Sequence, residues 1–428
     1  MNQHADTSVS TVSPNSAAKI LLASLIGTTI EYFDFYIFGT AAVLVFPKLF
    51  FAASDANVAI LQSLATFGLA FIARPVGSAL FGHFGDRIGR KATLVASLLT
   101  MGLSTILIGL LPSYASIGIA APLLLAVLRF GQGLGLGGEW GGAILLATEN
   151  APPGKRAWYG MFPQLGGPIG FFLSGSAFLL LTTQLPEADF LDWGWRIPFL
   201  SSAVLVIVGL YVRLHISETP QFQQIIAQKT QVKVPIVNVV TQHTGSLLLG
   251  MFTGLGQFVL FYLITVFTLS WATTSLGYAR QDFLVLQLIS VVFFGLFIPL
   301  AAKISDSKGG TYALMLGSIG ICILGLFLGP LLQAGSFTTV LALSIGMALM
   351  GLCFGPLGTL MSGLFPTEVR YTGASLSFNL SAIVGASFAP YIATWLATNH
   401  GLQFVGYYLS GMASISVVAL WAVKKYKL

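Results

Sequence analysis

The chain has 428 residues, of which 8% are charged and 55% are apolar, and its formal net charge is +6 at pH 7. A soluble protein carries roughly 25% charged residues, so this composition excludes a water-exposed surface and predicts an all-α protein in a lipid bilayer. The lysines and arginines are scattered over short loops and form no basic face, which excludes nucleic acid as a partner. Cys322 and Cys353 lie in apolar stretches, so we expect neither a disulfide nor a metal site.

The first 18 residues are polar and lack the charged region and cleavage site of a signal peptide, so we expect a disordered cytoplasmic tail. Twelve apolar runs follow, each near the ~20 residues that cross ~30 Å of hydrocarbon as a helix. The expected spans are 20–46, 58–82, 93–111, 117–146, 158–183, 195–213, 245–272, 282–302, 312–331, 337–361, 372–396 and 401–423. The longest polar interruption, 215–244, is the expected cytoplasmic linker between an N-terminal six-helix bundle (19–214) and a C-terminal one (245–423), and 424–428 form a second tail.

The distribution of positive charge predicts the orientation. Fifteen lysines and arginines, among them Arg213 at the end of the sixth span, lie on the side of the membrane that holds both termini, whereas three lie on the other side. Because cytoplasmic loops are rich in Lys and Arg, we expect both termini in the cytoplasm. Arg74 and Arg129 remain inside spans, where a charge is costly.

Two carboxylates, Glu31 and Asp34, lie in the first span. Their spacing of three residues places them on one helix face. A charge at membrane depth usually faces a cavity or a partner, and burial and a nearby cation move the pKa of a carboxyl in opposite directions. Either the two acids form static ion pairs that join helices, or at least one of them takes up and releases protons. We favour proton coupling, with Asp34 as the first candidate.

Arg129 lies in the fourth span and keeps its charge, so it needs an anion. Its planar guanidinium matches a carboxylate through two parallel hydrogen bonds. We expect this anion to alternate between Asp34 or Glu31 and a substrate carboxylate; the alternative is a fixed structural pair with one of the two acids. Arg74 precedes Pro75, which should kink the second span, and either lines the cavity or pairs with Glu31.

The fourth span also contains the stretch Gly133-x-Gly135-x-x-Gly138. It matches a dinucleotide-binding fingerprint by letters only, because no strand precedes it. Close helix packing is the expected use of these glycines. Glu139 follows them and is expected either in a gate network or hydrated near the cytoplasmic end of the span.

Residues 82–91 form a predicted tight cytoplasmic loop, whose glycines allow a sharp turn. We expect Asp86 in this loop to bind the N-terminus of a helix, where partial positive charge lies, and so to latch the cytoplasmic side. The alternative is an ordinary loop that sets topology through its cations. A weak repeat relates the two halves, because Asp306 follows the eighth span as Asp86 follows the second.

Later spans carry polar side chains that would contact a substrate or, equally, join helices through hydrogen bonds. They are Gln164, Gln257, Tyr262, Gln287 and Asn379. No nucleophile elbow, zinc-protease motif or phosphate-binding loop is present. The sequence therefore predicts neither an enzyme nor an ATP-driven pump, and no cofactor.

Several motifs resemble those of the major facilitator superfamily and, more specifically, of its metabolite:proton symporter branch. They are Gly82 to Lys91, Glu31 to Tyr36, Arg74-Pro75-x-Gly77, Arg129-x-x-Gln132-Gly133, Gly137 to Gly142, Trp193 to Leu200, Glu218-Thr219-Pro220-x-Phe222 and Phe365 to Gly373. They cover nearly the whole chain in the family's order. That branch includes proton-coupled importers of shikimate, α-ketoglutarate, citrate, and proline or betaine.

The resemblance implies a twelve-helix major facilitator fold in a bacterial inner membrane, a monomer, and alternating access to a site between the halves. It implies a central charged set of Asp34, Glu31 and Arg129. The expected substrate contacts are Arg129, Tyr32, Tyr36, Arg74 and Gln132, together with the polar residues of the later spans. Gate charges are expected at Asp86, Arg87, Arg90, Glu139, Glu149, Arg156, Asp306, Glu368 and Arg370.

The chain departs from the family pattern at two places, of which the first concerns the cytoplasmic latch and the second the substrate. The loop from Ser305 to Gly309 lacks the usual arginines, so the second-half latch should be weaker. The chain stops at Leu428 without heptads, which disfavours the osmosensing proline/betaine type. We therefore expect a proton symporter that imports a small organic carboxylate, either shikimate-like or a dicarboxylate. An uncoupled facilitator or exchanger, and a symporter of a zwitterionic compatible solute, are the alternatives.

Overall fold

The structure is a computed structural model that describes residues 17–52, 55–88, 90–214 and 235–426. From residue 82 to 91, residue 89 excepted, it describes the helical backbone and, of the side chains, only that of Phe84. Within these ranges every regular element is a helix, and twelve helices or runs of successive helices are long and apolar enough to cross a membrane. The predictions of an all-α fold and of twelve spans are confirmed.

The N-terminal half contains the first six spans. Its elements are α1 (Ala17–Leu44), α2 (Phe46–Leu49), α3 (Ala56–Ile88), α4 (Arg90–Leu110), α5 (Tyr114–Ile117), α6 (Ala120–Gly137), α7 (Trp140–Glu149), α8 (Arg156–Gln184), α9 (Glu187–Asp189), the π-helix η1 (Phe190–Gly194) and α10 (Arg196–Leu214). The fourth span is made of α6 and α7, and the sixth of α9, η1 and α10.

The C-terminal half contains the other six spans. Its elements are α12 (Pro235–Gln242), α13 (Thr244–Thr253), α14 (Leu255–Tyr262), the π-helix η2 (Leu263–Phe267), α15 (Thr268–Thr274), α16 (Arg280–Lys308), α17 (Gly310–Gln333), α18 (Ser336–Gly363), α19 (Arg370–Ala382), the π-helix η3 (Ile383–Ser387), α20 (Ala389–His400) and α21 (Leu402–Tyr426). The seventh span runs from α13 to α15, and the eleventh from α19 to α20.

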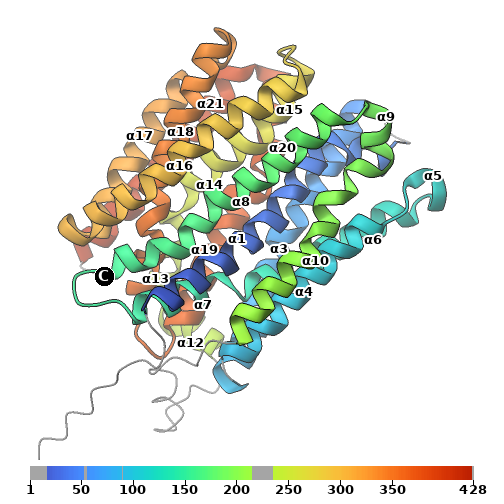
Figure 1. The fold of residues 1–428 in the computed structure, drawn as a ribbon. Coiled ribbons are helices and arrows are strands. Elements are labelled where there is room, and N and C mark those ends of the chain that lie inside the picture. Colours follow the sequence, from blue (N-terminus) through green and yellow to red (C-terminus); the bar gives the residue numbers. More distant parts are fainter. Residues whose placement is uncertain (1–16, 53–54, 89, 215–234, 427–428) are drawn as a thin grey trace, which may run out of the picture.

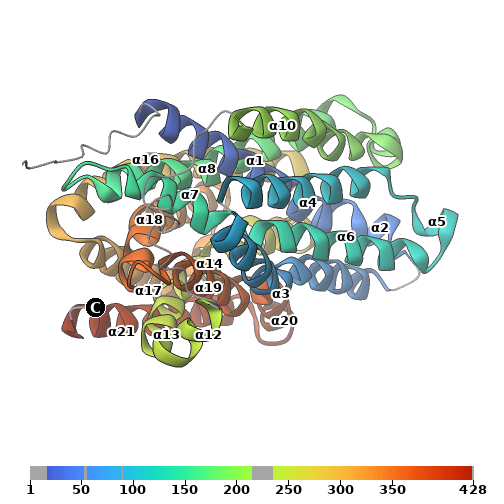
Figure 2. The same ribbon diagram turned by 90° about the horizontal axis from the view of Figure 1, so that it is seen from below.

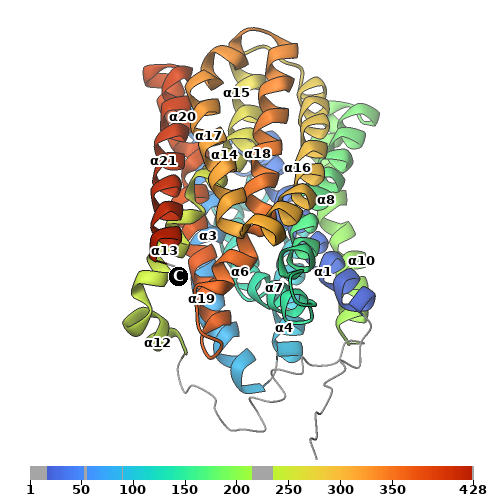
Figure 3. The ribbon, with the colours of Figure 1, turned by 90° about the vertical axis from the view of Figure 1, so that its left-hand side faces the viewer.

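The halves lie side by side, with helices of one half in contact with helices of the other along the boundary (Figures 2 and 3). The main contacts across it join α8 to α16 and α18, and α3 to α19 and η3. We call the end of the bundle that holds Ala17 and Tyr426 the terminal end, and the end that holds α5 and α9 the opposite end (Figure 1).

Glycines set how closely helices pack within the N-terminal half. A Cβ atom at Gly77 of α3 would overlap the carbonyl oxygen of Leu134 in α6, and one at Gly133 of α6 would overlap the backbone of Ala70 in α3. Small residues of this kind let two membrane helices approach to backbone contact. The glycine-rich fourth span therefore serves helix packing, as the sequence predicted.

Three expectations about loops need correction. Residues 82–88, expected in a tight loop, continue α3 to Ile88, and α4 begins at Arg90. No proline interrupts this stretch, and each glycine costs a helix only about 1 kcal/mol, so the helix extends past the apolar segment.

The expected linker 215–244 contains α12, whose Val239 is buried against Leu247 and Leu364. The helices also enter both expected tails, since α1 begins at Ala17 and α21 ends at Tyr426; the rest of these tails and residues 215–234 lie outside the described residues.

Four of the spans are interrupted. The fourth breaks between α6 and α7, and the sixth, seventh and eleventh contain the π-helices η1, η2 and η3. π-helical turns are frequently found at functional sites. The seventh span contributes Phe261 and Tyr262 to the centre of the molecule, and the fourth contributes Arg129.

Candidate functional site

The centre of the molecule is a cluster of buried aromatic rings from both halves, which we call the central aromatic cluster. Its members are Tyr32, Phe35, Tyr36, Phe67, Phe71 and Phe171 from the N-terminal half and Phe261, Tyr262, Phe294 and Phe354 from the C-terminal half. Across the boundary, ring centroids lie 5.2 Å apart for Phe71 and Tyr262 and 5.4 Å apart for Tyr36 and Phe261. The predicted contact residues Tyr32, Tyr36 and Tyr262 therefore meet between the halves.

Two arginines lie against this cluster. The guanidinium of Arg74 is 4.6 Å from the ring centre of Phe35, and that of Arg129 is 4.4 Å from the same ring. Arg129 also lies 4.0 Å from the ring of Phe38 and 4.8 Å from that of Phe67. Cation–π contacts of this kind are stronger when the cation is desolvated, and Arg129 is fully buried.

The hydrogen bonds of Arg129 overturn one expectation. Its Nη1 donates to Gln132 Oε1 at 2.8 Å and its Nε to the carbonyl of Phe67 at 3.4 Å, while Nη2 has no partner. Among the described residues no carboxylate forms an ion pair with Arg129. The fixed structural pair with Asp34 or Glu31, one of the two alternatives, is therefore absent, because the aromatic rings and Gln132 surround the guanidinium instead. The anion that alternates stays a prediction.

Asp34 is held on the other side of α1. Ser202 of α10 donates a 2.5 Å hydrogen bond to Asp34 Oδ1, and Oδ2 is buried without a partner. Thr105 of α4 lies beside the same carboxyl and accepts a 2.7 Å hydrogen bond from Gln132 Nε2. A chain of polar side chains therefore leads from Arg129 through Gln132 and Thr105 to Asp34. The sequence analysis did not single out Ser202 or Thr105, because a lone hydroxyl in an apolar span carries no distinctive signal.

Glu31 lies one turn before Asp34 and is 3% exposed, with Oε2 unpartnered. Arg74 and Arg213 lie close enough for their charges to act on it, but neither forms an ion pair with it in the described part of the chain. Of the two alternatives for Arg74, an ion pair with Glu31 is therefore not formed. Its Nε is buried without a hydrogen-bond partner.

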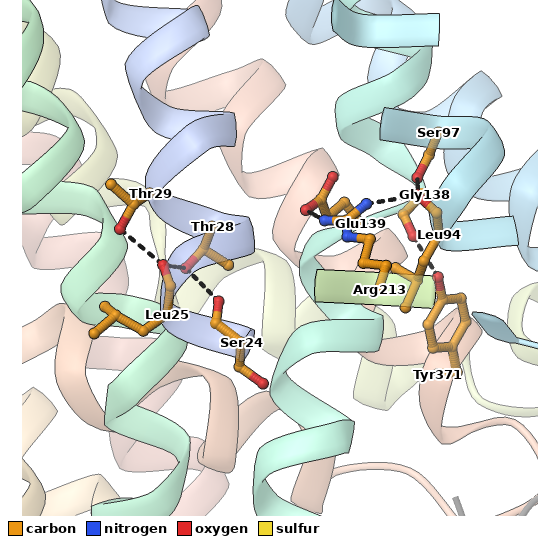
Figure 4. Close-up of polar contacts among 10 residues, drawn as sticks. All are labelled: Ser24, Leu25, Thr28, Thr29, Leu94, Ser97, Gly138, Glu139, Arg213 and Tyr371. Atoms are coloured by element: carbon orange, nitrogen blue, oxygen red, sulfur yellow. Dashed lines mark hydrogen bonds and ion pairs between the residues drawn. The ribbon is translucent and has the colours of Figure 1, made fainter. Parts of the chain in front are cut away.

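Glu139 and Arg213 form a buried ion pair nearer the terminal end (Figure 4). Arg213 also donates to the carbonyl of Leu94 at 2.6 Å. A Cβ atom at Gly27 of α1 would lie 3.1 Å from Arg213 Nη2, so the pair packs directly against α1. Of the two alternatives for Glu139, hydration is wrong, because its side chain is 1% exposed. Arg213, which the sequence analysis counted only toward the orientation of the chain, is its buried partner. The sequence did not single out Arg213 as a buried partner, because a positive charge at the end of an apolar span usually marks the cytoplasmic side of the membrane.

Several polar side chains cross the boundary toward the terminal end. Gln164 donates to the carbonyl of Phe354 at 2.7 Å, and Asn379 donates to Ser78 Oγ at 2.6 Å. Gln164 also accepts from Trp140, whose ring stacks on Phe378 with centroids 3.8 Å apart. In this conformation, Gln164 and Asn379 therefore join the halves.

Asp306 also crosses the boundary, at the terminal end itself. Its two carboxylate oxygens accept hydrogen bonds from the backbone N–H groups of Ala157 and Trp158, at 2.9 and 3.0 Å. These groups belong to the first turn of α8, where a helix is partially positive. Asp306 of the C-terminal half thus binds the first turn of α8, which belongs to the other half. This is the type of contact that the sequence predicted for Asp86.

The two remaining glutamines differ from each other. Gln287 donates to the carbonyls of Ile264 and Thr265 at 2.8 and 2.9 Å, which satisfies backbone groups of the π-helix η2. Gln257 is 3% exposed, and neither its Nε2 nor its Oε1 has a partner. Gln287 is therefore occupied in supporting a helix, whereas Gln257 keeps both polar atoms available.

The other predicted gate charges gather at the terminal end. Arg370 donates to the carbonyl of Phe365 at 3.2 Å, and the charges of Arg156, Glu149 and Glu368 act on it. The side chains of Asp86, Arg87 and Arg90 lie outside the described residues, so the predicted latch at Asp86 stays a prediction. Over the side chains that are described, no three His, Cys, Asp or Glu residues converge as metal ligands would.

Comparison with known proteins places this arrangement among membrane transporters. Residues 19–238 match the family model described as "Sugar (and other) transporter". The "Inner membrane metabolite transport protein YhjE" of Escherichia coli is 56% identical over 95% of this chain and 94% of the relative. The "Shikimate transporter" and the "Proline/betaine transporter" of the same organism are 35% and 33% identical, over 91% and 96% of this chain and 90% and 84% of the relatives.

Solved structures agree on the fold. The proton:xylose symporter XylE bound to 6-bromo-6-deoxy-D-glucose superimposes with a TM-score of 0.75 over 95% of each chain, at 17% sequence identity. At that identity the match shows the fold alone.

Proposed function

Because the chain belongs to the major facilitator superfamily of membrane transporters, as a metabolite transporter rather than an enzyme, we propose that it imports a small organic carboxylate together with protons. The substrate would bind at the central aromatic cluster, with the two halves opening alternately to either side. The relatives named for shikimate and for proline and betaine support a small metabolite as substrate.

One observation carries the choice of a carboxylate: the buried guanidinium of Arg129 has a free Nη2 and no carboxylate partner among the described residues. A guanidinium keeps its charge in a protein, and a buried charge without a counter-ion is costly. A substrate carboxylate would supply the missing charge and accept from Nη2. The unpartnered atoms of Arg74 and Gln257 offer further polar contacts near the same rings.

Asp34 is our proposed proton carrier, acting on Arg129 through the polar chain. An ionised carboxylate only accepts hydrogen bonds, whereas a protonated one also donates. Protonation of Asp34 would therefore change its bond with Ser202 and its contact with Thr105. Thr105 accepts a hydrogen bond from Gln132, which in turn accepts one from Arg129. Protonation of Asp34 would thus change how tightly Arg129 binds substrate, although Asp34 and Arg129 do not contact each other.

A zwitterionic substrate with a quaternary ammonium group is the second candidate, because the aromatic rings suit such a cation. The arginines already lie against three of the rings, Phe35, Phe67 and Phe71, which favours an anion over a cation at this place. We further propose that the protein is a monomer in the bacterial inner membrane with both termini in the cytoplasm, in keeping with the name of the relative YhjE and the charge bias of the loops.

Transport into proteoliposomes tests the proposal. With an inward proton gradient, labelled shikimate or α-ketoglutarate should accumulate above its outside concentration, and an internal pH dye should report proton entry with it. Asp34→Asn should abolish accumulation but keep exchange of labelled for unlabelled substrate. Accumulation that persists in Asp34→Asn would refute this proton carrier, and uptake of betaine without uptake of either acid would refute the substrate class.

A further inference from the structure

A cavity lies at the opposite end of the boundary between the halves. Its volume is about 650 Å³, and its walls include Leu44 and Lys48 from the first two helices and Thr274, Tyr278 and Arg280 from the other half. Leu44 follows Tyr36 by eight residues on α1, so the cavity begins roughly 12 Å along the helix from the central aromatic cluster. The cavity therefore lies on the path between one membrane surface and the proposed substrate site.

The charged groups that line this cavity are both cations, Lys48 and Arg280. One carboxylate oxygen, Glu187 Oε1, binds both of them, at 2.6 Å from Lys48 Nζ and 3.6 Å from Arg280 Nη2. Glu187 itself does not line the cavity and is 61% exposed. Because Glu187 belongs to the N-terminal half and Arg280 to the C-terminal half, the glutamate links the halves across the mouth.

We propose that Lys48 and Arg280 form an entrance site for the carboxylate of the substrate, and that Glu187 is a built-in competitor for it. Exposed ion pairs contribute only about 0–1 kcal/mol, so an incoming carboxylate can replace Glu187 at low cost. Replacement removes the link between Glu187 and Arg280, and the mouth then opens in response to an anion. The neighbouring acid Asp55 does not compete, because its side chain accepts from the N–H of Asn57 at the start of α3.

This inference rests on the proposed function for the identity of the ligand, but its test does not require transport. Cys322 and Cys353 are replaced by Ser and Ala, and Thr274→Cys, an exposed position on the cavity wall, is introduced. The purified protein is then treated with methanethiosulfonate reagents of similar size, one carrying a sulfonate and one a trimethylammonium group. The ratio of the two reaction rates reports the electrostatic potential in the cavity.

With Glu187→Gln, the rate of the anionic reagent should rise and that of the cationic reagent should fall, each by up to roughly fivefold, the effect of one unit charge ~4 Å away in water. The ratio of the two rates should therefore rise by up to about 25-fold in favour of the anionic reagent. Adding Lys48→Gln and Arg280→Gln should reverse the rise. A control cysteine at Ser336, exposed at the same end but outside the cavity, should show no change. An unchanged ratio at Thr274→Cys in all variants would overturn the proposed site.

Protection by ligands identifies the class of molecule. Succinate and shikimate at millimolar concentration should slow labelling of Thr274→Cys in the Glu187→Gln protein, and betaine should not. Protection by betaine equal to that by the acids would overturn a carboxylate site. If the rate ratios and protection behave as expected but neither acid is transported by the unaltered protein, the proposed function fails and the anion site stands.

Discussion

Arg213 and Glu139 form an ion pair inside the bundle, with side chains only 10% and 1% exposed. Both lie next to Gly27, one turn of α1 before Glu31. The pair therefore closes the N-terminal half behind the proposed proton-binding region, on the side of the terminal end.

Removing one partner of this pair should destabilise the fold. Arg213→Gln or Glu139→Gln alone leaves a buried charge without a counter-ion, which costs about 3–5 kcal/mol. We expect a clear fall in the melting temperature of the purified protein in detergent. The double variant should recover most of the loss, because two neutral amides can bond to each other. Equal melting temperatures for the single variants and the unaltered protein would show that the pair is hydrated in solution.

Arg129→Lys should weaken substrate binding although the charge is kept. A lysine ammonium lacks the planar fork and the stacking of a guanidinium, and Arg129 contacts three aromatic rings. We expect KM for the transported acid to rise at least about tenfold, equivalent to ~1.4 kcal/mol. The matched control is Arg196→Lys. Arg196 donates to the carbonyls of Gly109 and Leu111 at the opposite end, so its variant should keep KM. Similar KM values for both variants would remove Arg129 from the binding site.

Asp306→Ala should favour the conformation that is open at the terminal end. The variant loses the bonds to the N-terminus of α8, a contact typically worth 0.3–1 kcal/mol, which corresponds to up to about a fivefold shift in the ratio of the two conformations. Spin labels at Pro153→Cys and Thr367→Cys, exposed positions of the two halves, would report the shift as a larger population of long distances.

The control for Asp306 is Ser307→Ala. This neighbouring hydroxyl bonds only within its own helix, to the carbonyl of Ile304, so its removal should leave the distance distribution unchanged. An unchanged distribution in Asp306→Ala as well would show that the contact contributes nothing to closure.

Two glycine variants should separate folding from conformational change. Alanine at Gly77 would overlap the backbone of Leu134 in the same half, and overpacking of this kind costs about 1–3 kcal/mol or more. We expect poor insertion and a low melting temperature. Alanine at Gly358 would instead crowd the side chain of Ile144 in the other half, 2.6 Å from its Cδ1. It should keep the melting temperature within a few degrees but change the transport rate. A reversal of the two outcomes would contradict the packing described above.

The sequence led reliably to features that depend on short stretches of chain. Glu31, Asp34 and Arg129 were recognised because a charged residue within an apolar run is conspicuous, and the structure buries all three inside the N-terminal half. The prediction of a loop at residues 82–91 was wrong, because glycines that permit a turn also permit a helix when packing favours it.

By itself, the sequence determined the twelve spans and the helical fold, because a chain without water around it must satisfy its backbone hydrogen bonds within each segment. Only the tertiary structure decided which group each buried charge meets. Arg213 and Glu139 are 74 residues apart in the chain, and Arg129 is surrounded by rings from α1 and α3 rather than by an acid. Such partners come from different helices, and their choice depends on helix rotation and packing, which the apolar pattern of a single span does not specify.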